Sequence, residues 1–230
     1  MGALQIVGDT AVPLDKKLDK LTWANKIYGT WPEPLLAVHT SARGGQGEVV
    51  FRFADDKWTQ VRTAKGTVHG YATWTNGREL VLIEDSTQPR FEWLRGSGPR
   101  PRLHVGKGCG PGISRPSLHS LPNGDMIVYG SSCTALTGAA VERWADGKVT
   151  GRYDELPAPS GWVVKIQDAV LVSRDDIELF GLRVDPGARA DHQPAKPYIA
   201  RCDGKAWQAI DQLPQSGAIL AVSRAPDGTV

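Results

Sequence analysis

Cysteine, methionine and long apolar runs are all scarce in this chain, and each scarcity argues against a class of protein. Three cysteines and two methionines occur in 230 residues. The cysteines show no CxxC or Cys/His spacing of the kind that binds zinc, so we expect no metal site and no cofactor. No stretch approaches the roughly 20 apolar residues of a membrane span, so we expect no transmembrane helix.

An excess of charge of one sign is missing as well. The 27 Lys and Arg nearly balance the 25 Asp and Glu, which leaves a net charge of +2. Such a balance provides no basic field to attract nucleic acid or an anionic membrane, and we expect neither as a partner. The segment Met1–Asp9 also lacks the basic and apolar regions of a signal peptide, so we expect none here.

Turn-forming residues are plentiful by contrast. The chain has 26 Gly and 16 Pro, spread along its length, together with 8 Trp. Glycine and proline favour the turns that separate strands, so their even spread along the chain indicates many short strands. This composition favours an all-β protein in one domain, since β architectures of this length commonly form a single domain.

A repeat unit of four short apolar segments, separated by turns, recurs along the sequence. Its first copy spans residues 27–63, and its predicted strands are 27–31, 35–40, 48–53 and 57–61. The pair Asp55-Asp56 between the last two strands is a hairpin signal, because Asp tolerates the positive φ of a tight turn. Four strands in about 35 residues are typical of one blade of a β-propeller.

Three more copies of the repeat unit follow, at residues 68–95, 113–154 and 162–211. Their turns use the same residue types, at Asn76-Gly77, Asp146-Gly147 and Asp203-Gly204. A tryptophan takes a similar place in three copies, at Trp58, Trp93 and Trp207. Coincidental tryptophan spacing in a β-sandwich is the alternative. Because the turns and the tryptophans repeat together, we predict a β-propeller of four-stranded antiparallel blades.

This repeat unit resembles the repeats of bacterial β-propellers of the kelch-like and photosystem-assembly-factor-like kinds. Those repeats combine an apolar strand, a glycine-rich loop and a segment of the form W-T-x-V, which Trp58-Thr59-Gln60-Val61 matches. The likeness covers about residues 27–214. It implies the propeller architecture and names no ligand, since the same repeat serves many binding roles.

The two ends of the chain supply the parts of a further blade. Residues 217–222 look like an innermost strand and residues 4–8 like a second strand. We predict one domain over residues 1–230, a five-bladed ring whose last blade combines 216–230 with 3–24. Closure would cover the edge strands and give a monomer. The alternative is a piece of a larger ring.

The longest irregular segments, 95–112 and 183–197, mark one face of the predicted ring. The first leads into a blade and the second joins the second and third strands of another, and connections of these two kinds lie on the same face. Long loops in compact domains are commonly functional, the alternative being insertions without a role. The ligand-binding candidates in these segments are Arg102, His104, Lys107, Asp191 and His192.

Two cysteines are predicted on that same face, within one blade. A disulfide bridge between Cys109 and Cys133 is feasible if their Cα atoms lie within about 7 Å of each other. The bridge would favour a periplasmic or extracellular location, because disulfides persist in oxidising compartments. Cys202 falls in a hairpin, and we expect it to be a small buried residue.

The predicted innermost strands carry basic side chains toward the central channel. The channel candidates are His69, Arg115, His119 and Lys165. These groups would suit an anionic ligand, or they would bond the backbone of the channel wall. Asp168 is the single acidic residue on those strands, whereas glycoside hydrolysis needs two carboxyl groups.

Two classes of function follow from these features. A non-catalytic binding or scaffold module would recognise a protein, peptide or glycan through the long-loop face. A hydrolase of the glycosidase kind would use the central channel. Because the inner strands carry so few carboxylates, we favour the binding module and assign no catalytic residue.

Overall fold

The computed structural model describes most of the chain between Leu4 and Val222. The described residues are 4–7, 10–13, 23–28, 33–39, 47–55, 57–85, 89–103, 114–121, 123–131, 138–145, 147–153, 156–185, 195–210, 219 and 222. Apart from a short 3-10 helix at Thr75–Gly77, the regular elements among them are strands, which confirms the prediction of an all-β protein. Within this part of the chain, no helix is long and apolar enough to cross a membrane.

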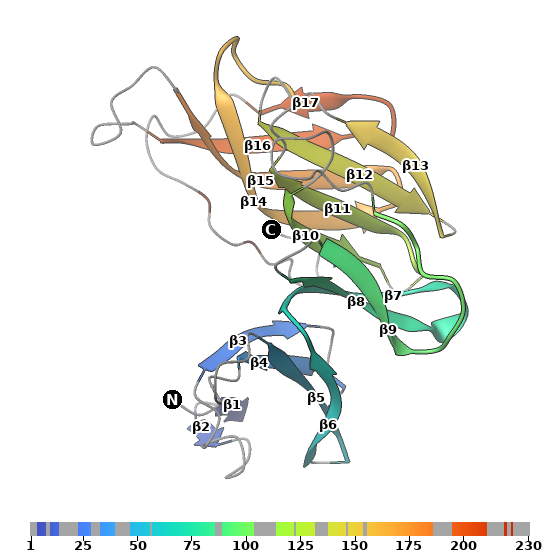
Figure 1. The fold of residues 1–230 in the computed structure, drawn as a ribbon. Helices are drawn as coiled ribbons and strands as arrows, with labels where there is room; N and C mark the ends of the chain where they lie inside the picture. The colour runs from blue at the N-terminus through green and yellow to red at the C-terminus, as the bar shows by residue number, and fades with distance from the viewer. Residues whose placement is uncertain are drawn as a thin grey trace.

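The strands form antiparallel sheets that follow one another in chain order, and we number these sheets as blades 1 to 4 (Figure 1). Blade 1 contains β3 (Trp23–Tyr28), β4 (Leu35–His39), β5 (Glu48–Ala54) and β6 (Lys57–Ala64). Blade 2 contains β7 (Thr67–Thr73), β8 (Glu79–Glu84) and β9 (Pro89–Arg95). Blade 3 contains β10 (Ser114–Ser120), β11 (Met126–Ser131), β12 (Ala139–Ala145) and β13 (Lys148–Tyr153). Blade 4 contains β14 (Val163–Ser173), β15 (Asp176–Val184), β16 (Lys196–Cys202) and β17 (Trp207–Ala209).

Each blade is an up-and-down sheet, with sequence neighbours paired as sheet neighbours. The first strands of successive blades contact one another, β7 beside β10 and β10 beside β14. These are the relations between the inner strands of a β-propeller, which confirms the predicted architecture. A separate hairpin, β1 (Leu4–Val7) with β2 (Thr10–Pro13), precedes blade 1.

The tight turns lie where the sequence predicts them. Asp55, between β5 and β6, has a φ of 51°, and Asn76, between β7 and β8, has a φ of 65°. Gly147 and Gly204, with φ of 75° and 86°, turn the chain between the last two strands of blades 3 and 4. Asp, Asn and Gly adopt a positive φ at the least cost, so the local sequence is enough to place these hairpins.

Strand boundaries and one repeat position differ from the prediction. The inner strand of blade 1 begins at Trp23, whereas the pattern predicted it from Ile27. Trp93 lies in β9, the third strand of blade 2, while Trp58 and Trp207 lie in fourth strands. Blade 2 accordingly has three strands in the described residues, not four. The prediction was wrong here because it equated tryptophans that occupy different places in their blades.

Apolar clusters between neighbouring blades hold the sheets together. Blades 1 and 2 share a buried cluster that includes Val50, Val68 and Ile83. The corresponding cluster between blades 3 and 4 includes Ile127, Leu179 and Cys202, the last fully buried as predicted. Burying each large apolar side chain contributes about 1.5–3 kcal/mol relative to exposure, so these clusters dominate the stability of the stack.

Side chains of blade 1 cap the channel edge of the inner strand of blade 2. The Val68 N–H donates to the Glu48 carboxylate at 2.7 Å, and the Tyr28 hydroxyl donates to the Val68 carbonyl at 2.7 Å. Burial, and then the negative charge of Glu48, raises the pKa of Tyr28, so this phenol keeps its proton. The two contacts satisfy backbone groups that the free edge of a sheet leaves open.

An arginine–carboxylate contact joins equivalent positions in two pairs of blades. Arg52 in β5 bonds Glu79, the first residue of β8 in the next blade. Arg143 in β12 lies 3.3 Å from Asp175, which directly precedes β15 in the next blade. Both arginines stand two residues before the last alanine of a third strand. We call these two contacts the inter-blade ion pairs.

The junction of blades 2 and 3 carries aromatic rings at the corresponding place. Trp74, in the first hairpin of blade 2, packs against Trp144 of β12 with 6.2 Å between ring centroids. Phe91 of β9 packs against the same Trp144 ring at 5.9 Å, edge to face. Such pairs prefer this geometry and add to the stabilisation from buried area.

The predicted fifth blade falls largely outside the described residues. Of residues 216–230, only Ile219 and Val222 are described. Both donate backbone hydrogen bonds to blade 4, Ile219 to the Gly181 carbonyl at 3.2 Å and Val222 to Asp168 at 2.9 Å. This part of the C-terminal segment therefore lies against blade 4, where a following blade would begin. Five-bladed closure stays a prediction.

Candidate functional site

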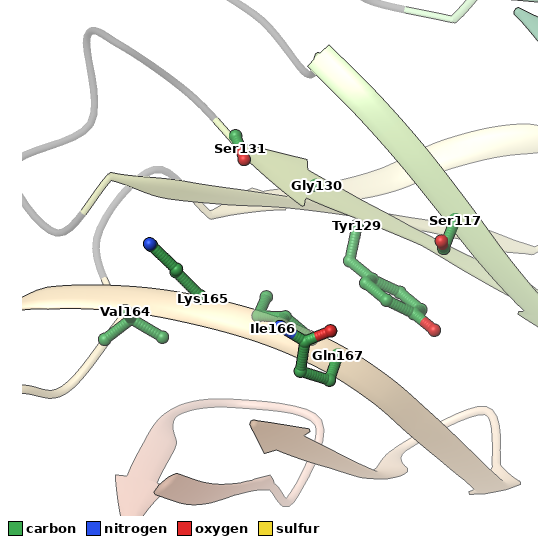
Figure 2. Close-up of a pocket in the computed structure, with 8 residues that line it drawn as sticks. All are labelled: Ser117, Tyr129, Gly130, Ser131, Val164, Lys165, Ile166 and Gln167. Atoms are coloured by element: carbon green, nitrogen blue, oxygen red, sulfur yellow. The ribbon is translucent and has the colours of Figure 1, made fainter. Parts of the chain in front are cut away.

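A polar pocket lies where the inner strand of blade 4 passes the first two strands of blade 3 (Figure 2). Its volume of about 340 Å³ falls within the range of about 300–1,000 Å³ for small-molecule sites. The lining residues are Ser117 of β10, Tyr129, Gly130 and Ser131 of β11, and Val164, Lys165, Ile166 and Gln167 of β14. Hydroxyl, amide and ammonium groups therefore converge on one small space.

Lys165 supplies the positive charge of the pocket. Its side chain is exposed, and Figure 2 shows it extending from β14 on the side of Ser131. Among the described residues, Lys165 forms no salt bridge within 4 Å. Gln167 stands two positions along the same strand and is also exposed. Both residues line the same pocket, so an ammonium and an amide donor are presented to one cavity.

The pocket lies at the end of the blades from which the long connecting segments leave. Ser114 pairs with Ser131 at this end of blade 3, and Val163 pairs with Val184 at this end of blade 4. The segments attached to these strand ends are 104–113, 132–137 and 186–194. Their points of attachment therefore lie at the same end of blades 3 and 4 as the pocket, and whether the segments form one face stays a prediction.

Asp168 follows the pocket segment of β14 and accepts hydrogen bonds on both carboxylate oxygens. Oδ1 accepts from the Ala169 N–H at 2.9 Å and from the Tyr129 hydroxyl at 3.5 Å, and Oδ2 accepts from the Val222 N–H at 2.9 Å. Burial, and then the charge of Asp168, raises the pKa of Tyr129, so the phenol stays neutral at physiological pH. One carboxylate thus connects the pocket wall to the C-terminal segment.

A bulge in β14 between Ile166 and Asp168 shapes the pocket segment against Gly181 of β15. A Cβ atom at Gly181 would overlap the backbone carbonyl oxygen of Lys165. A glycine in a strand commonly marks such a close approach of two backbones. The absence of a side chain at Gly181 therefore lets β14 carry the bulge that orients Lys165 and Gln167.

We expect Gly181→Ala to destabilise the protein by about 1–3 kcal/mol, because the added methyl forces two backbones apart. Urea unfolding followed by circular dichroism measures the change. Gly151→Ala is the matched control, since a Cβ there meets the side chain of Tyr153, which can rotate aside. Equal stability of the two variants would show that the close approach at Gly181 is unimportant.

The structure brings one of the four channel candidates into the pocket, Lys165. Arg115 is the second residue of β10, and its side chain is outside the described part. His119 is half-buried further along β10, in register with Ile127. His69 belongs to blade 2, where its Nε2 lies 3.0 Å from Glu84 Oε2. The expected ring of basic channel groups is therefore divided among separate places.

The loop candidates lie mainly outside the described residues. Arg102 is described and exposed, and it does not line the pocket. The candidates that fall on segments without a described structure are His104, Lys107, Asp191 and His192, together with Cys109 and Cys133. The disulfide stays a prediction. Within the described ranges, no group of three or more His, Cys, Asp or Glu could hold a metal ion.

Sequence reasoning missed most of the polar lining of the pocket. Ser117, Ser131 and Gln167 are common residue types on strands, and nothing local distinguishes them from solvated positions. Tyr129 falls in the third copy, where the pattern gives it no role. The bulge at Gln167 interrupts the alternation of side chains along β14, so the sequence pattern does not place Gln167 beside Lys165.

Comparisons with known proteins concern the fold alone. No protein-family model matches the chain, and no curated protein matches its sequence. Among solved structures, the chain is similar to MPT-4, a mannose phosphorylase from Leishmania mexicana in complex with phosphate ion. The TM-score is 0.46 at 11% identity, over 89% of this chain and 76% of that chain.

A similarity this distant assigns neither a ligand nor a reaction to the chain. The propeller architecture inferred from the repeats is present, and no comparison supports a kelch-like assignment.

Proposed function

We propose that this propeller binds a hydroxyl-rich ligand, a glycan, through the pocket between blades 3 and 4. The observation that carries the proposal is the convergence of Lys165, Gln167 and two serine hydroxyls on a cavity of about 340 Å³. Hydroxyl, amide and ammonium groups can donate to, and in part accept from, the many hydroxyls of a sugar. The long-loop segments attach around the same pocket and would extend the contact.

The size and lining of the pocket favour a sugar over a protein surface. A protein partner buries about 800 Å² on each side, mostly against a surface with an apolar centre. Here the cavity is small, and polar atoms dominate its wall. One sugar unit at the end of a glycan would match it better than a folded partner would.

Lys165→Ala is expected to weaken glycan binding at least about tenfold, since a hydrogen bond to a charged group contributes about 1.5–3 kcal/mol and 1.4 kcal/mol is a factor of ten. A glycan array identifies the best oligosaccharide, and isothermal titration calorimetry measures its affinity. Lys148→Ala, at an exposed lysine that begins β13, is the control. A panel without any binding, or equal affinities for the two variants, would refute the proposal.

A second candidate is a hydrolase that uses Asp168. The hydrogen bond from Tyr129 brings this carboxylate to the wall of the pocket. Against it, the carboxylate already accepts two backbone N–H donors, and the described inner strands carry no second acid for the two-carboxylate mechanism. Turnover of nitrophenyl glycosides by the wild-type protein, lost in Asp168→Asn, would favour the enzyme.

A further inference from the structure

Three polar side chains form a continuous hydrogen-bonded chain along one wall of the pocket. Ser117 of β10 and Tyr129 of β11 are directly paired in the sheet, which puts their side chains on the same face. A side-chain hydrogen bond joins them, and the Tyr129 hydroxyl lies 3.5 Å from Asp168 Oδ1. We call Ser117, Tyr129 and Asp168 the hydroxyl relay.

Asp168 sets the direction of the hydrogen bonds in the relay. Its Oδ1 also accepts the Ala169 N–H at 2.9 Å, and its Oδ2 accepts the Val222 N–H at 2.9 Å. A carboxylate only accepts hydrogen bonds, so it takes the hydrogen of the phenol and offers none in return. The single hydroxyl hydrogen of Tyr129 therefore points at Asp168.

The same direction passes on to Ser117. Because the phenol hydrogen is already used, the Tyr129 oxygen accepts in the second hydrogen bond, and the serine hydroxyl is the donor. Burial raises the pKa of Tyr129, the Asp168 carboxylate raises it further, and the hydrogen bond from Ser117 lowers it, as a donor to the phenol oxygen does. With its hydrogen turned toward Tyr129, Ser117 presents its oxygen lone pairs to the pocket that it lines.

The two ends of the pocket therefore differ in hydrogen-bonding character. Figure 2 shows Lys165 and Ser131 toward one end, and Ser117 with the Tyr129 hydroxyl toward the other. The ammonium of Lys165 is a donor only, whereas Ser117 in the relay is an acceptor. Asp168 is not one of the residues that line the pocket, so its effect on a ligand passes through the two hydroxyls.

We propose that Asp168 is a positioning residue, which acts through Tyr129 and Ser117 so that the pocket selects a ligand hydroxyl that donates a hydrogen bond. This inference rests on the glycan-binding function proposed above and adds a specificity to the same site. The sugar hydroxyl beside Ser117 donates to the serine oxygen, while other hydroxyls accept from Lys165 and Gln167. Fluorine in place of the first hydroxyl has no hydrogen to donate, so the relay distinguishes the two sugars.

The test uses the methyl glycosides of glucose, galactose and mannose, together with analogues in which one hydroxyl at a time is replaced by fluorine. Calorimetry is expected to show one position at which fluorine weakens binding of the preferred sugar about tenfold, an effect within the range of one hydrogen bond. Ser117→Ala removes the acceptor, and its affinity for the parent sugar should fall to that of wild-type protein for this analogue.

Two variants test the relay behind Ser117. Tyr129→Phe keeps the ring in the wall but frees Ser117 to turn its hydrogen into the pocket, so the discrimination between hydroxyl and fluorine is expected to disappear. Asp168→Asn should reduce it as well, because an amide donates as well as accepts. Tyr153→Phe, at a half-buried tyrosine of β13 that packs against Trp207, is the matched control and should keep the full discrimination. The discrimination is a ratio of two affinities, so a general loss of stability does not remove it.

The outcomes separate this inference from the proposed function. Analogues that all bind within about threefold of the parent sugar would overturn the role of the relay and leave glycan binding in place. A discrimination that survives unchanged in both Tyr129→Phe and Asp168→Asn would overturn it too. Failure of all three parent sugars to bind would also overturn this inference, and the glycan array then decides the proposed function by itself.

Discussion

Arg52→Ala is expected to lower the free energy of unfolding by about 3–5 kcal/mol, the cost of leaving one member of a buried ion pair without its partner. The side chains of Arg52 and Glu79 are only 14% and 11% exposed. The hydrogen bond that Arg52 donates to Glu79 raises the pKa of Arg52, so the guanidinium keeps its charge at pH 7. Without the guanidinium, the Glu79 carboxylate remains buried in the junction of blades 1 and 2. Urea unfolding at pH 7 measures the loss.

Arg201→Ala is the matched control for that experiment. Arg201 also contacts a carboxylate, Asp176, at 2.8 Å, but the contact lies on the surface of blade 4 with the arginine 55% exposed. Solvent screens such a pair, so we expect a stability close to that of the wild type. If Arg52→Ala is no more destabilised than Arg201→Ala, the inter-blade ion pairs do not hold the blades together.

Asp168→Ala is expected to destabilise the protein by about 2–3 kcal/mol, because several donors lose a charged acceptor at once. These donors are the N–H groups of Ala169 and Val222 and the hydroxyl of Tyr129. Val222 should then lose its protection against exchange, because its N–H no longer has the Asp168 acceptor. Hydrogen exchange at the Val222 amide and unfolding in urea measure the two effects.

Two further variants show whether the acceptor is responsible. Asp168→Asn retains one acceptor oxygen and should lose less stability than Asp168→Ala. Asp176→Ala removes a carboxylate from the surface pair with Arg201, which is 55% exposed, and should have a smaller effect still. Unchanged exchange at Val222 in Asp168→Ala would mean that the C-terminal segment is held by other contacts.

The sequence predicted those parts of the fold that depend on neighbouring residues. Asp55, Asn76 and Gly147 occupy turns that require a positive φ, and this requirement can be inferred from the residue types without knowing what lies across the sheet. The alternation of apolar residues identified the strands for the same reason. Two predictions were wrong, the strand boundary near Trp23 and the place of Trp93 in its blade. Both depend on which strand follows in the sheet, and the local sequence pattern does not contain this information.

The candidate site was only partly predictable. Lys165 was expected in the channel from its place on an inner strand, and it lies in the pocket. Ser117 and Ser131 reach the same pocket from another blade. Which residues meet between two blades depends on how the blades pack, and the residue pattern along the sequence does not encode this packing. The contacts of Arg183 and Lys196 with Trp162 were missed for a similar reason. Trp162 directly precedes β14, whereas the two cations lie on β15 and β16 and reach the indole through strand register.

The two kinds of contact between blades have a consequence for how the chain assembles. Blades of similar sequence and size can dock in the wrong order while a repeat protein folds, and such misassembly is a characteristic failure of repeat architectures. Here an arginine meets a carboxylate between blades 1 and 2 and between blades 3 and 4, whereas indole rings meet between blades 2 and 3. If blade 1 docked against blade 3, the Arg52 guanidinium would meet the Trp144 ring and the buried Glu79 would lose its cation. The chemistry at these junctions therefore disfavours an arrangement that skips blade 2, in addition to the order of the chain.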